Sequence, residues 1–211
     1  KKGRKDQSVA QHKRVWSSLS MERDGEVCRG QDEVFRWMAA EQARRNPAGE
    51  KDIVCVMDGQ SSLWNDRRTY LPMNNVVEIL DLLHVTPRLW EAAHLFHPEG
   101  SEEAAAFVRE RLLGILEGQV GYVIDGLRQM GTKRKLRGNR LKKLRQICNY
   151  LEKNRDRMRY DEYLAAGYPI ASGIIEGACR YVVKDRMERA GMRWTIEGAQ
   201  AMLDLRSTYI N

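Results

Sequence analysis

Two acidic residues stand where a carboxylate could take part in phosphoryl transfer. Asp58 directly follows the apolar, β-branched run IVCVM at 53–57, which predicts a buried strand with the carboxylate at its end. Glu176 falls in the first turns of a helix that Ser172-Gly173 is expected to open. Carboxylate oxygens are the ligands that Mg²⁺ prefers, and two such ions about 3.5–4 Å apart can bind the attacking and leaving oxygens of a phosphate. Each acid also fits a plainer interpretation, a turn for Asp58 and an ion pair within one helix for Glu176.

A run of basic residues lies between positions 133 and 145. Its sequence, KRKLRGNRLKKLR, contains eight cations and no acid. Lys and Arg side chains neutralise DNA phosphates and release counterions, so the run predicts contact with a nucleic-acid backbone. The alternative is a solvated helix face, the commoner role of a charged stretch. The eight residues are Lys133, Arg134, Lys135, Arg137, Arg140, Lys142, Lys143 and Arg145.

The order of predicted elements indicates a parallel β-α-β unit within an α/β fold. A helix is expected over 31–45, followed by the strand at 53–57, a helical segment, and a second strand, VVEIL, at 76–80. Thr86-Pro87 is expected to open the next helix, with the threonine as its N-cap. A strand, helix, strand and helix in this order imply parallel strands with a crossover. The short apolar run at 12–20 is expected to form a further strand.

Strand signals end at about position 97. Ser101 fits a helix N-cap followed by acidic residues, and apolar residues then recur at helical spacing. The stretch 97–165 is therefore expected to be an all-helical insertion. It separates an N-terminal core part at 1–96 from a C-terminal part at 166–211.

The composition of the 211 residues narrows the class of protein. A hydrophobic share of 42% with 31% charged residues is typical of a globular chain. No apolar run approaches the roughly 20 residues of a membrane-spanning helix, so no membrane partner is expected. The four cysteines stand apart without a CxxC pair, as is usual for reduced cytoplasmic thiols. The net charge of +7 is compatible with a polyanionic partner.

The segment 168–206 carries the most specific pattern in the chain. Pro169-x-x-Ser172-Gly173 precedes Glu176, an Arg/Lys-rich helix follows, and Gly-Met-Arg-Trp comes next at 191–194. This segment resembles the C-terminal signature of bacterial insertion-sequence transposases of the ISKra type, a group of the DDE transposases. The resemblance is tight over 53–96 and 166–206 and loose elsewhere. It implies that Glu176 is the last catalytic carboxylate.

The resemblance also implies an RNase H-like fold, in which the first acid lies on the first strand and the second at the end of the fourth. Only 23 positions separate Asp58 from Asp81, too few for the elements between those strands, so Asp58 is interpreted as the second acid. The chain would then hold a partial core of third strand, first helix, fourth strand, second helix and fifth strand, with the catalytic helix after the insertion. The first strand and its aspartate would lie upstream of Lys1.

Accessory residues follow from the same resemblance. Asp81 and His84 occupy the place of an acid-x-x-His pair that Mutator-like enzymes keep near the active site, where the pair would position DNA or the scissile phosphate. The alternative is that Asp81 ends a strand while His84 packs or hydrogen-bonds locally. Arg186, Arg193 and Trp194 follow the catalytic helix and would meet DNA near the cleft, with a core position as the alternative for Trp194.

The implied protein is a DNA transposase of the bacterial cytoplasm, associated with the nucleoid. Asp58 and Glu176 would bind two Mg²⁺ ions, for which Mn²⁺ can substitute, and the enzyme would nick transposon ends and join the freed 3′-hydroxyl to target DNA. Its partners would be double-stranded DNA and further copies of itself in a homo-oligomer. Without the first aspartate, the chain alone is expected to be inactive and marginally stable. The alternative is a truncated transposase remnant that binds DNA without cutting it.

Overall fold

The computed structural model describes the backbone of residues 11–23, 25–188 and 191–211, and the side chains of these residues except those at positions 23, 174 and 176. The chain divides into two compact units. The central unit is residues 50–173, and the terminal unit combines the described residues up to Gly49 with those from Ile174 onward. No helix in the described part of the chain is long and apolar enough to cross a membrane.

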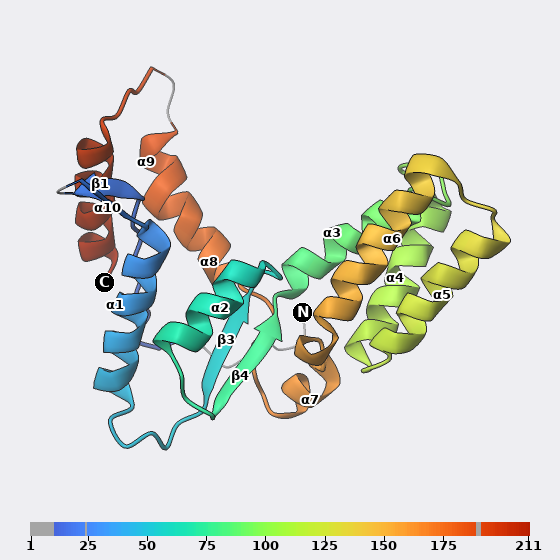
Figure 1. The fold of residues 1–211 in the computed structure, drawn as a ribbon, viewed down its shortest axis with the longest axis horizontal. Helices are drawn as coiled ribbons and strands as arrows, with labels where there is room; N and C mark the ends of the chain where they lie inside the picture. The colour runs from blue at the N-terminus through green and yellow to red at the C-terminus, as the bar shows by residue number, and fades with distance from the viewer. Residues whose placement is uncertain (1–10, 24, 189–190) are drawn as a thin grey trace, which may run out of the picture. The chain divides into compact units, whose positions relative to one another are not determined.

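The central unit contains a pair of parallel strands. β3 (Ile53–Met57) and β4 (Val76–Leu80) are joined through α2 (Ser61–Tyr70), as Figure 1 shows. Their Val- and Ile-rich sequences favour an extended, partly buried backbone. Since the strands are parallel, Asp58 and Asp81, each the next residue after its strand, follow at the same edge of the sheet. The strand pair and its connecting helix confirm the predicted β-α-β unit.

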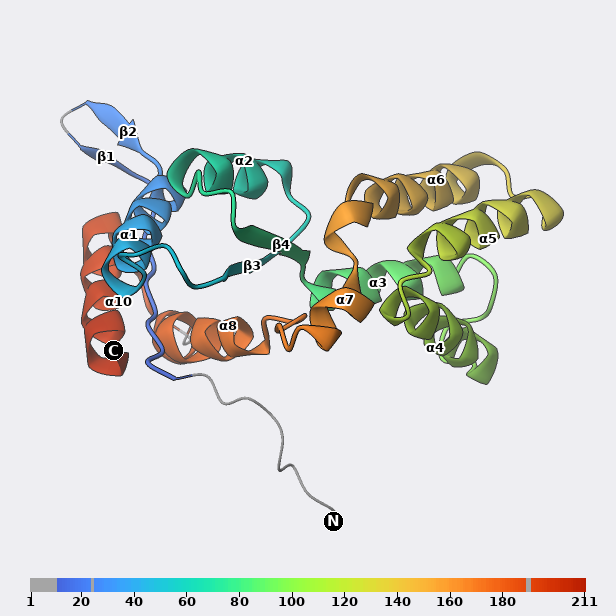
Figure 2. The same cartoon turned by 90° about the horizontal axis from the view of Figure 1, so that it is seen from below.

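Helices form the rest of the central unit, and no strand is described between positions 97 and 165. Ser101 Oγ accepts a hydrogen bond from the Ala104 amide at 3.2 Å, which confirms the predicted N-cap. Apolar side chains from these helices share one buried core with those of β4. Figure 2 shows α4, α5 and α6 grouped at the end of the unit away from the strands. The helices are α3 (Leu82–Ala93), α4 (Glu102–Leu116), α5 (Val120–Lys133), α6 (Gly138–Lys153), η1 (Arg155–Arg157) and α7 (Tyr160–Ala165).

The terminal unit combines a small antiparallel hairpin with helices. Its Phe35, Val182 and Leu203 are buried. Together with the central unit, it makes the described chain a mostly helical α/β protein with two small two-stranded sheets, in which no RNase H core is recognisable. The elements are β1 (Met21–Arg23), β2 (Glu26–Cys28), α1 (Gly30–Arg45), α8 (Gly173–Ala178, starting at the last residue of the central unit), the π-helical η2 (Cys179–Lys184), α9 (Asp185–Met187) and α10 (Ile196–Ile210).

Residues 12–20 form no strand, so the prediction for this run is wrong. Side chains at the C-terminal end of the chain hold the segment instead. Gln200 Oε1 accepts from the Leu19 amide at 2.8 Å, and Asn211 Oδ1 accepts from the Val15 amide at 2.7 Å. These side chains satisfy backbone donors that a neighbouring strand would otherwise satisfy. A local apolar pattern cannot reveal such distant partners.

The helix α3 begins earlier than its Thr86-Pro87 pair predicts. Its N-cap is Asp81, whose Oδ1 accepts from the Leu83 amide at 2.9 Å. Pro87 therefore lies inside the helix, where it lacks the amide hydrogen of a normal helical bond. The buried apolar face of α3, which includes Val85 and Leu89, offsets this loss.

Candidate active site at the carboxyl edge of the parallel strands

The carboxylate of Asp58 lies at the end of β3 and is accessible to solvent. Its side chain is 39% exposed. One oxygen, Oδ1, accepts from the Gly59 amide at 2.5 Å and from the Tyr150 hydroxyl at 3.4 Å. The same oxygen lies 3.6 Å from Nδ1 of His84. The other oxygen, Oδ2, makes no hydrogen bond to any residue that the structure describes, so it is available to a ligand.

Gly59 allows helix α6 to approach Asp58 closely. A Cβ atom at position 59 would lie 2.7 Å from Cε2 of Tyr150, 2.8 Å from its hydroxyl and 2.9 Å from Nδ2 of Asn154, distances that real Cβ atoms do not adopt. A larger residue here would force the side chains of Tyr150 and Asn154 to move. The tyrosine that donates to Asp58 is therefore placed by the absence of a side chain on the neighbouring residue.

Tyr150 is a neutral hydrogen-bond donor at ordinary pH. Burial of the ring raises the pKa of Tyr150 to about 12, and the negative charge of Asp58 adds to this effect. The guanidinium of Arg88 lies over the ring, 5.0 Å from its centroid, and acts in the opposite direction. The sequence pattern did not mark Tyr150 as a functional residue, because it occupies one of the regularly spaced apolar positions of a helix.

Asp81 has a different environment from Asp58, although both follow strands. It is 1% exposed. Its Oδ1 accepts from the amides of Leu83, at 2.9 Å, and Ser172, at 3.3 Å, and its Oδ2 accepts from the Ser172 hydroxyl. The Leu82 amide also donates to the Ile170 carbonyl at 3.0 Å. Asp81 thus caps α3 and ties the segment 170–172 to the end of β4.

His84, the other member of the predicted accessory pair, points to Asp58. It lies on α3 and has 49% of its side chain exposed. Among the two members of the pair, His84 is therefore the one that a substrate at Asp58 could reach. The buried Asp81 bonds only to its own surroundings in the described chain.

Glu176 belongs to α8, but its side chain lies outside the described residues. Asp58 is in the central unit and Glu176 in the terminal unit. Their convergence on one metal site therefore stays a prediction. No group of three or more His, Cys, Asp or Glu side chains suited to a metal ion occurs among the residues whose side chains are described.

The basic run surrounds the turn between α5 and α6. Most of its cations are exposed there and have no acidic partner in the described chain. Two are engaged: Arg140 donates to the Leu95 carbonyl, and Nζ of Lys143 lies 3.1 Å from Glu91. The exposed members whose side chains have no partner in the described chain are Lys133, Arg134, Lys135, Arg137, Lys142 and Arg145.

The remaining predicted DNA-contacting residues belong to the terminal unit. Arg186 lies on α9 and Arg193 precedes α10, and both are exposed. Trp194 is 37% exposed, so it is not a fully buried core anchor. All three belong to the terminal unit, whereas Asp58 belongs to the central unit.

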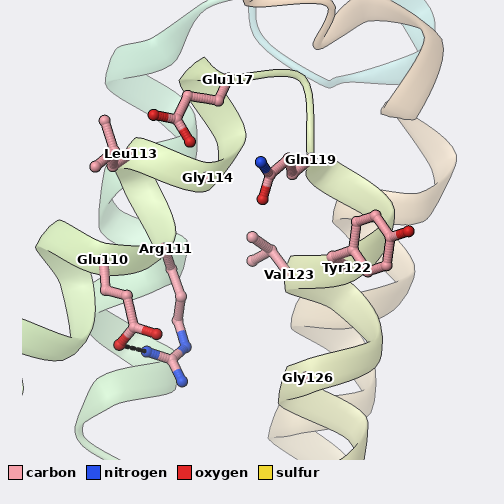
Figure 3. Close-up of a pocket in the computed structure, with 9 residues that line it drawn as sticks. All are labelled: Glu110, Arg111, Leu113, Gly114, Glu117, Gln119, Tyr122, Val123 and Gly126. Carbon is pink, nitrogen blue, oxygen red and sulfur yellow. Dashed lines mark hydrogen bonds and ion pairs between the residues drawn. The ribbon is translucent and has the colours of Figure 1, made fainter.

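A separate groove of about 360 Å³ lies between α4 and α5, and Figure 3 shows its lining. Arg111 donates to Glu110 at 3.2 Å along this groove. Gln119, Tyr122 and Val123 line it from α5 and the residue before it. The lining includes neither Asp58 nor any of its neighbours, so this groove is distinct from the candidate site.

Comparison of the chain with protein-family models, with curated proteins and with solved structures found no match. The chemistry of the residues around Asp58 and the sequence pattern at 168–206 are therefore the basis for assigning a function.

Proposed function

We propose that this chain is part of the catalytic domain of a DDE transposase, which nicks transposon ends and joins the 3′-hydroxyl to target DNA. The observation that carries the proposal is the environment of the Asp58 carboxylate. Its carboxylate is exposed at the carboxyl edge of two parallel strands, and its Oδ2 is free of partners in the described chain. Ligands of α/β sheets characteristically bind at this edge.

Asp58 and Glu176 are the residues that would hold Mg²⁺ in this proposal. An exposed aspartate with an unengaged oxygen fits a magnesium ligand, because Mg²⁺ takes one or two carboxylates together with water and substrate phosphate. The metal ions would supply activation of the attacking hydroxyl and stabilisation of the leaving oxygen, with Mn²⁺ able to replace Mg²⁺. The resemblance implies a further catalytic acid on another strand of the fold.

The anchoring of Ser172 supports the involvement of Glu176. Ser172 is bonded to Asp81 at the end of β4, and Glu176 follows it by four positions along the chain. His84 beside Asp58 would contact the scissile phosphate or the DNA strand. The relation to the RNase H fold is part of this proposal, supported by the parallel pair of β3 and β4 with α2 between them.

The exposed cations of the basic run support double-stranded DNA as the partner. Six of them have side chains without any partner in the described chain and gather around one turn, where they could neutralise several phosphates. This observation equally favours the second candidate function, a transposase remnant that binds DNA without cutting it. A homo-oligomer on DNA remains part of the first proposal only.

The test compares the 211-residue chain with the product of its complete reading frame on supercoiled plasmid DNA with Mg²⁺ or Mn²⁺. We expect nicking by the complete product, abolished in both Asp58→Asn and Glu176→Gln, with DNA binding retained. DNA binding without cleavage by either protein would support the remnant instead. Cleavage that survives both substitutions, or the absence of DNA binding, would overturn the proposal.

A further inference from the structure

A polar groove of about 280 Å³ opens between α3 and α6, next to the candidate active site. A cavity that holds one water needs about 10–15 Å³ of such space, so this groove can admit a larger polar group. Tyr150 lines this groove and its hydroxyl also donates to Asp58, so one residue contacts both the groove and the carboxylate at the end of β3. The lining residues are Arg88, Glu91, Lys143, Gln146, Ile147 and Tyr150.

The two helices turn matching faces toward this groove. On α3, His84, Arg88 and Glu91 are spaced by four and three residues, which places them on one face. On α6, Lys143 and Tyr150 are seven residues apart and share a face in the same way. Tyr150, which donates to Asp58 and lies under the guanidinium of Arg88, therefore links the carboxylate to the cations of the groove.

The groove holds two cations and one anion. Nη1 of Arg88 lies 3.1 Å and Nζ of Lys143 lies 3.1 Å from Oε2 of Glu91. Burial alone would raise the pKa of Glu91, but the hydrogen bonds from Lys143 and Arg88 outweigh it and hold that pKa below its usual range. The carboxylate is thus ionised at neutral pH, and the groove keeps one uncompensated positive charge.

Both cations are accessible to an incoming anion. The side chains of Arg88 and Lys143 are 40% and 42% exposed. The guanidinium of Arg88 lies over the ring of Tyr150, and its Nη1 donates to Glu91, so its other nitrogens can still donate to a ligand. A planar guanidinium with a free edge suits bidentate recognition of phosphate.

We propose that Arg88 and Lys143 form a phosphate-binding subsite for the DNA strand whose neighbouring phosphate lies at Asp58, and that Glu91 occupies this subsite until DNA displaces it. The inference rests on the proposed function, because it takes a DNA phosphodiester as the ligand. Tyr150 is a positioning residue that holds Arg88 on one side and Asp58 on the other.

A second cluster of charged residues, around Glu152, provides control substitutions for Glu91 and Arg88. Glu152 also lies beside two guanidinium groups, 3.3 Å from Arg128 and 3.8 Å from Arg155, but it is outside the groove. Glu152→Gln therefore produces the same change in net charge as Glu91→Gln, and Arg128→Gln the same as Arg88→Gln. Circular dichroism of each variant checks that it is folded.

The experiment measures the affinity of the full chain for a duplex DNA oligonucleotide by fluorescence anisotropy over a range of salt concentrations. Relative to Arg128→Gln, we expect Arg88→Gln to bind about tenfold more weakly, with a salt slope smaller by about one. Glu91→Gln should bind several-fold more tightly than Glu152→Gln, because the competing carboxylate is gone. Equal effects within each matched pair would overturn the subsite.

The cleavage assay separates this inference from the proposed function. If Asp58→Asn leaves cleavage intact while the matched pairs differ as expected, the subsite stands and the catalytic assignment fails. If Asp58→Asn abolishes cleavage while Arg88→Gln and Arg128→Gln behave alike, the catalytic assignment stands and the subsite is overturned.

Discussion

The ends of β3 and β4 carry the same side chain in opposite surroundings. Asp58 follows β3 with 39% of its side chain exposed and one oxygen free of partners in the described chain. Asp81 follows β4 at 1% exposure, and both its oxygens accept hydrogen bonds. The two residues are equivalent in sequence context, since each comes directly after a strand of a parallel pair.

The difference arises from the donors that approach each carboxylate. At Asp81 a serine amide, a serine hydroxyl and a helix amide use the acceptor capacity, so the carboxylate stabilises the fold. At Asp58 the donors use only Oδ1, so the carboxylate can still bind a ligand. An acid at the end of a strand is therefore a candidate catalytic group only where the fold leaves it without sufficient partners.

The largest expected effect comes from removing the buried carboxylate. Asp81→Ala should lower the free energy of unfolding by about 3 kcal/mol, because it removes a helix cap and leaves partly buried donors of Ser172 and Leu83 unsatisfied. Asp58→Ala should change it by no more than about 0.5 kcal/mol, as is usual for an exposed position. Urea denaturation of both variants measures the contrast. Equal losses at the two positions would show that the environments are not as different as described.

Gly59→Ala is expected to lower the free energy of unfolding by less than Asp81→Ala does. The added methyl group would collide with Tyr150 and Asn154, and such overpacking costs about 1–3 kcal/mol. Gly126→Ala is the matched control, since a Cβ at that position in α5 meets nothing within 4 Å. Because alanine favours the helix more than glycine does, Gly126→Ala should raise the free energy of unfolding by about 1 kcal/mol. Thermal denaturation that moves both variants in the same direction would contradict the close approach of α6 to Asp58.

Removal of a single donor to Asp81 should have a moderate effect. Ser172→Ala eliminates the hydroxyl but keeps the backbone amide bond, so we expect a loss of about 1 kcal/mol in unfolding free energy. Ser61→Ala, which loses a bond from Lys153 at an exposed position, serves as the control and should be nearly neutral. Chemical denaturation that cannot distinguish the two would mean that Ser172 does not hold Asp81.

The smallest expected effect is on the ionisation of Tyr150. Burial and the charge of Asp58 raise its pKa to about 12, so its contribution to stability is present below pH 10 and is lost as the pH rises through about 12. Asp58→Asn removes one cause and should lower this pKa, whereas Ser61→Ala should not. Carbon NMR of labelled tyrosine rings, assigned with Tyr150→Phe, measures the titration. An unchanged pKa in Asp58→Asn would place the two groups further apart.

Local sequence patterns predicted most elements around the candidate site. The apolar runs at 53–57 and 76–80 are β3 and β4, they are parallel, and an aspartate follows each. The helix at 31–45 and the N-cap at Ser101 were also predicted correctly. These features depend on neighbours within a few positions, where side-chain periodicity and capping chemistry decide the conformation.

The contacts that distinguish Asp58 from Asp81 could not be predicted in this way. Ser172 meets Asp81 across 91 positions, and Tyr150 meets Asp58 across 92. The segment 12–20 failed as a strand for the same reason, because Gln200 satisfies Leu19 across 181 positions. Such pairs depend on the tertiary fold, and a single sequence carries no signal for them.

The bond between Ser172 and Asp81 has a consequence for the synthesis of the protein. A ribosome adds roughly 5–20 residues per second, so about 5–18 s pass between the addition of Asp81 and that of Ser172, 91 positions later. During this interval the end of β4 lacks the segment that covers it in the finished fold. The nascent chain must therefore carry Asp81 without its two hydrogen bonds from Ser172 for seconds, and during this interval the cap on α3 is the only one of the three bonds that the Asp81 carboxylate can make.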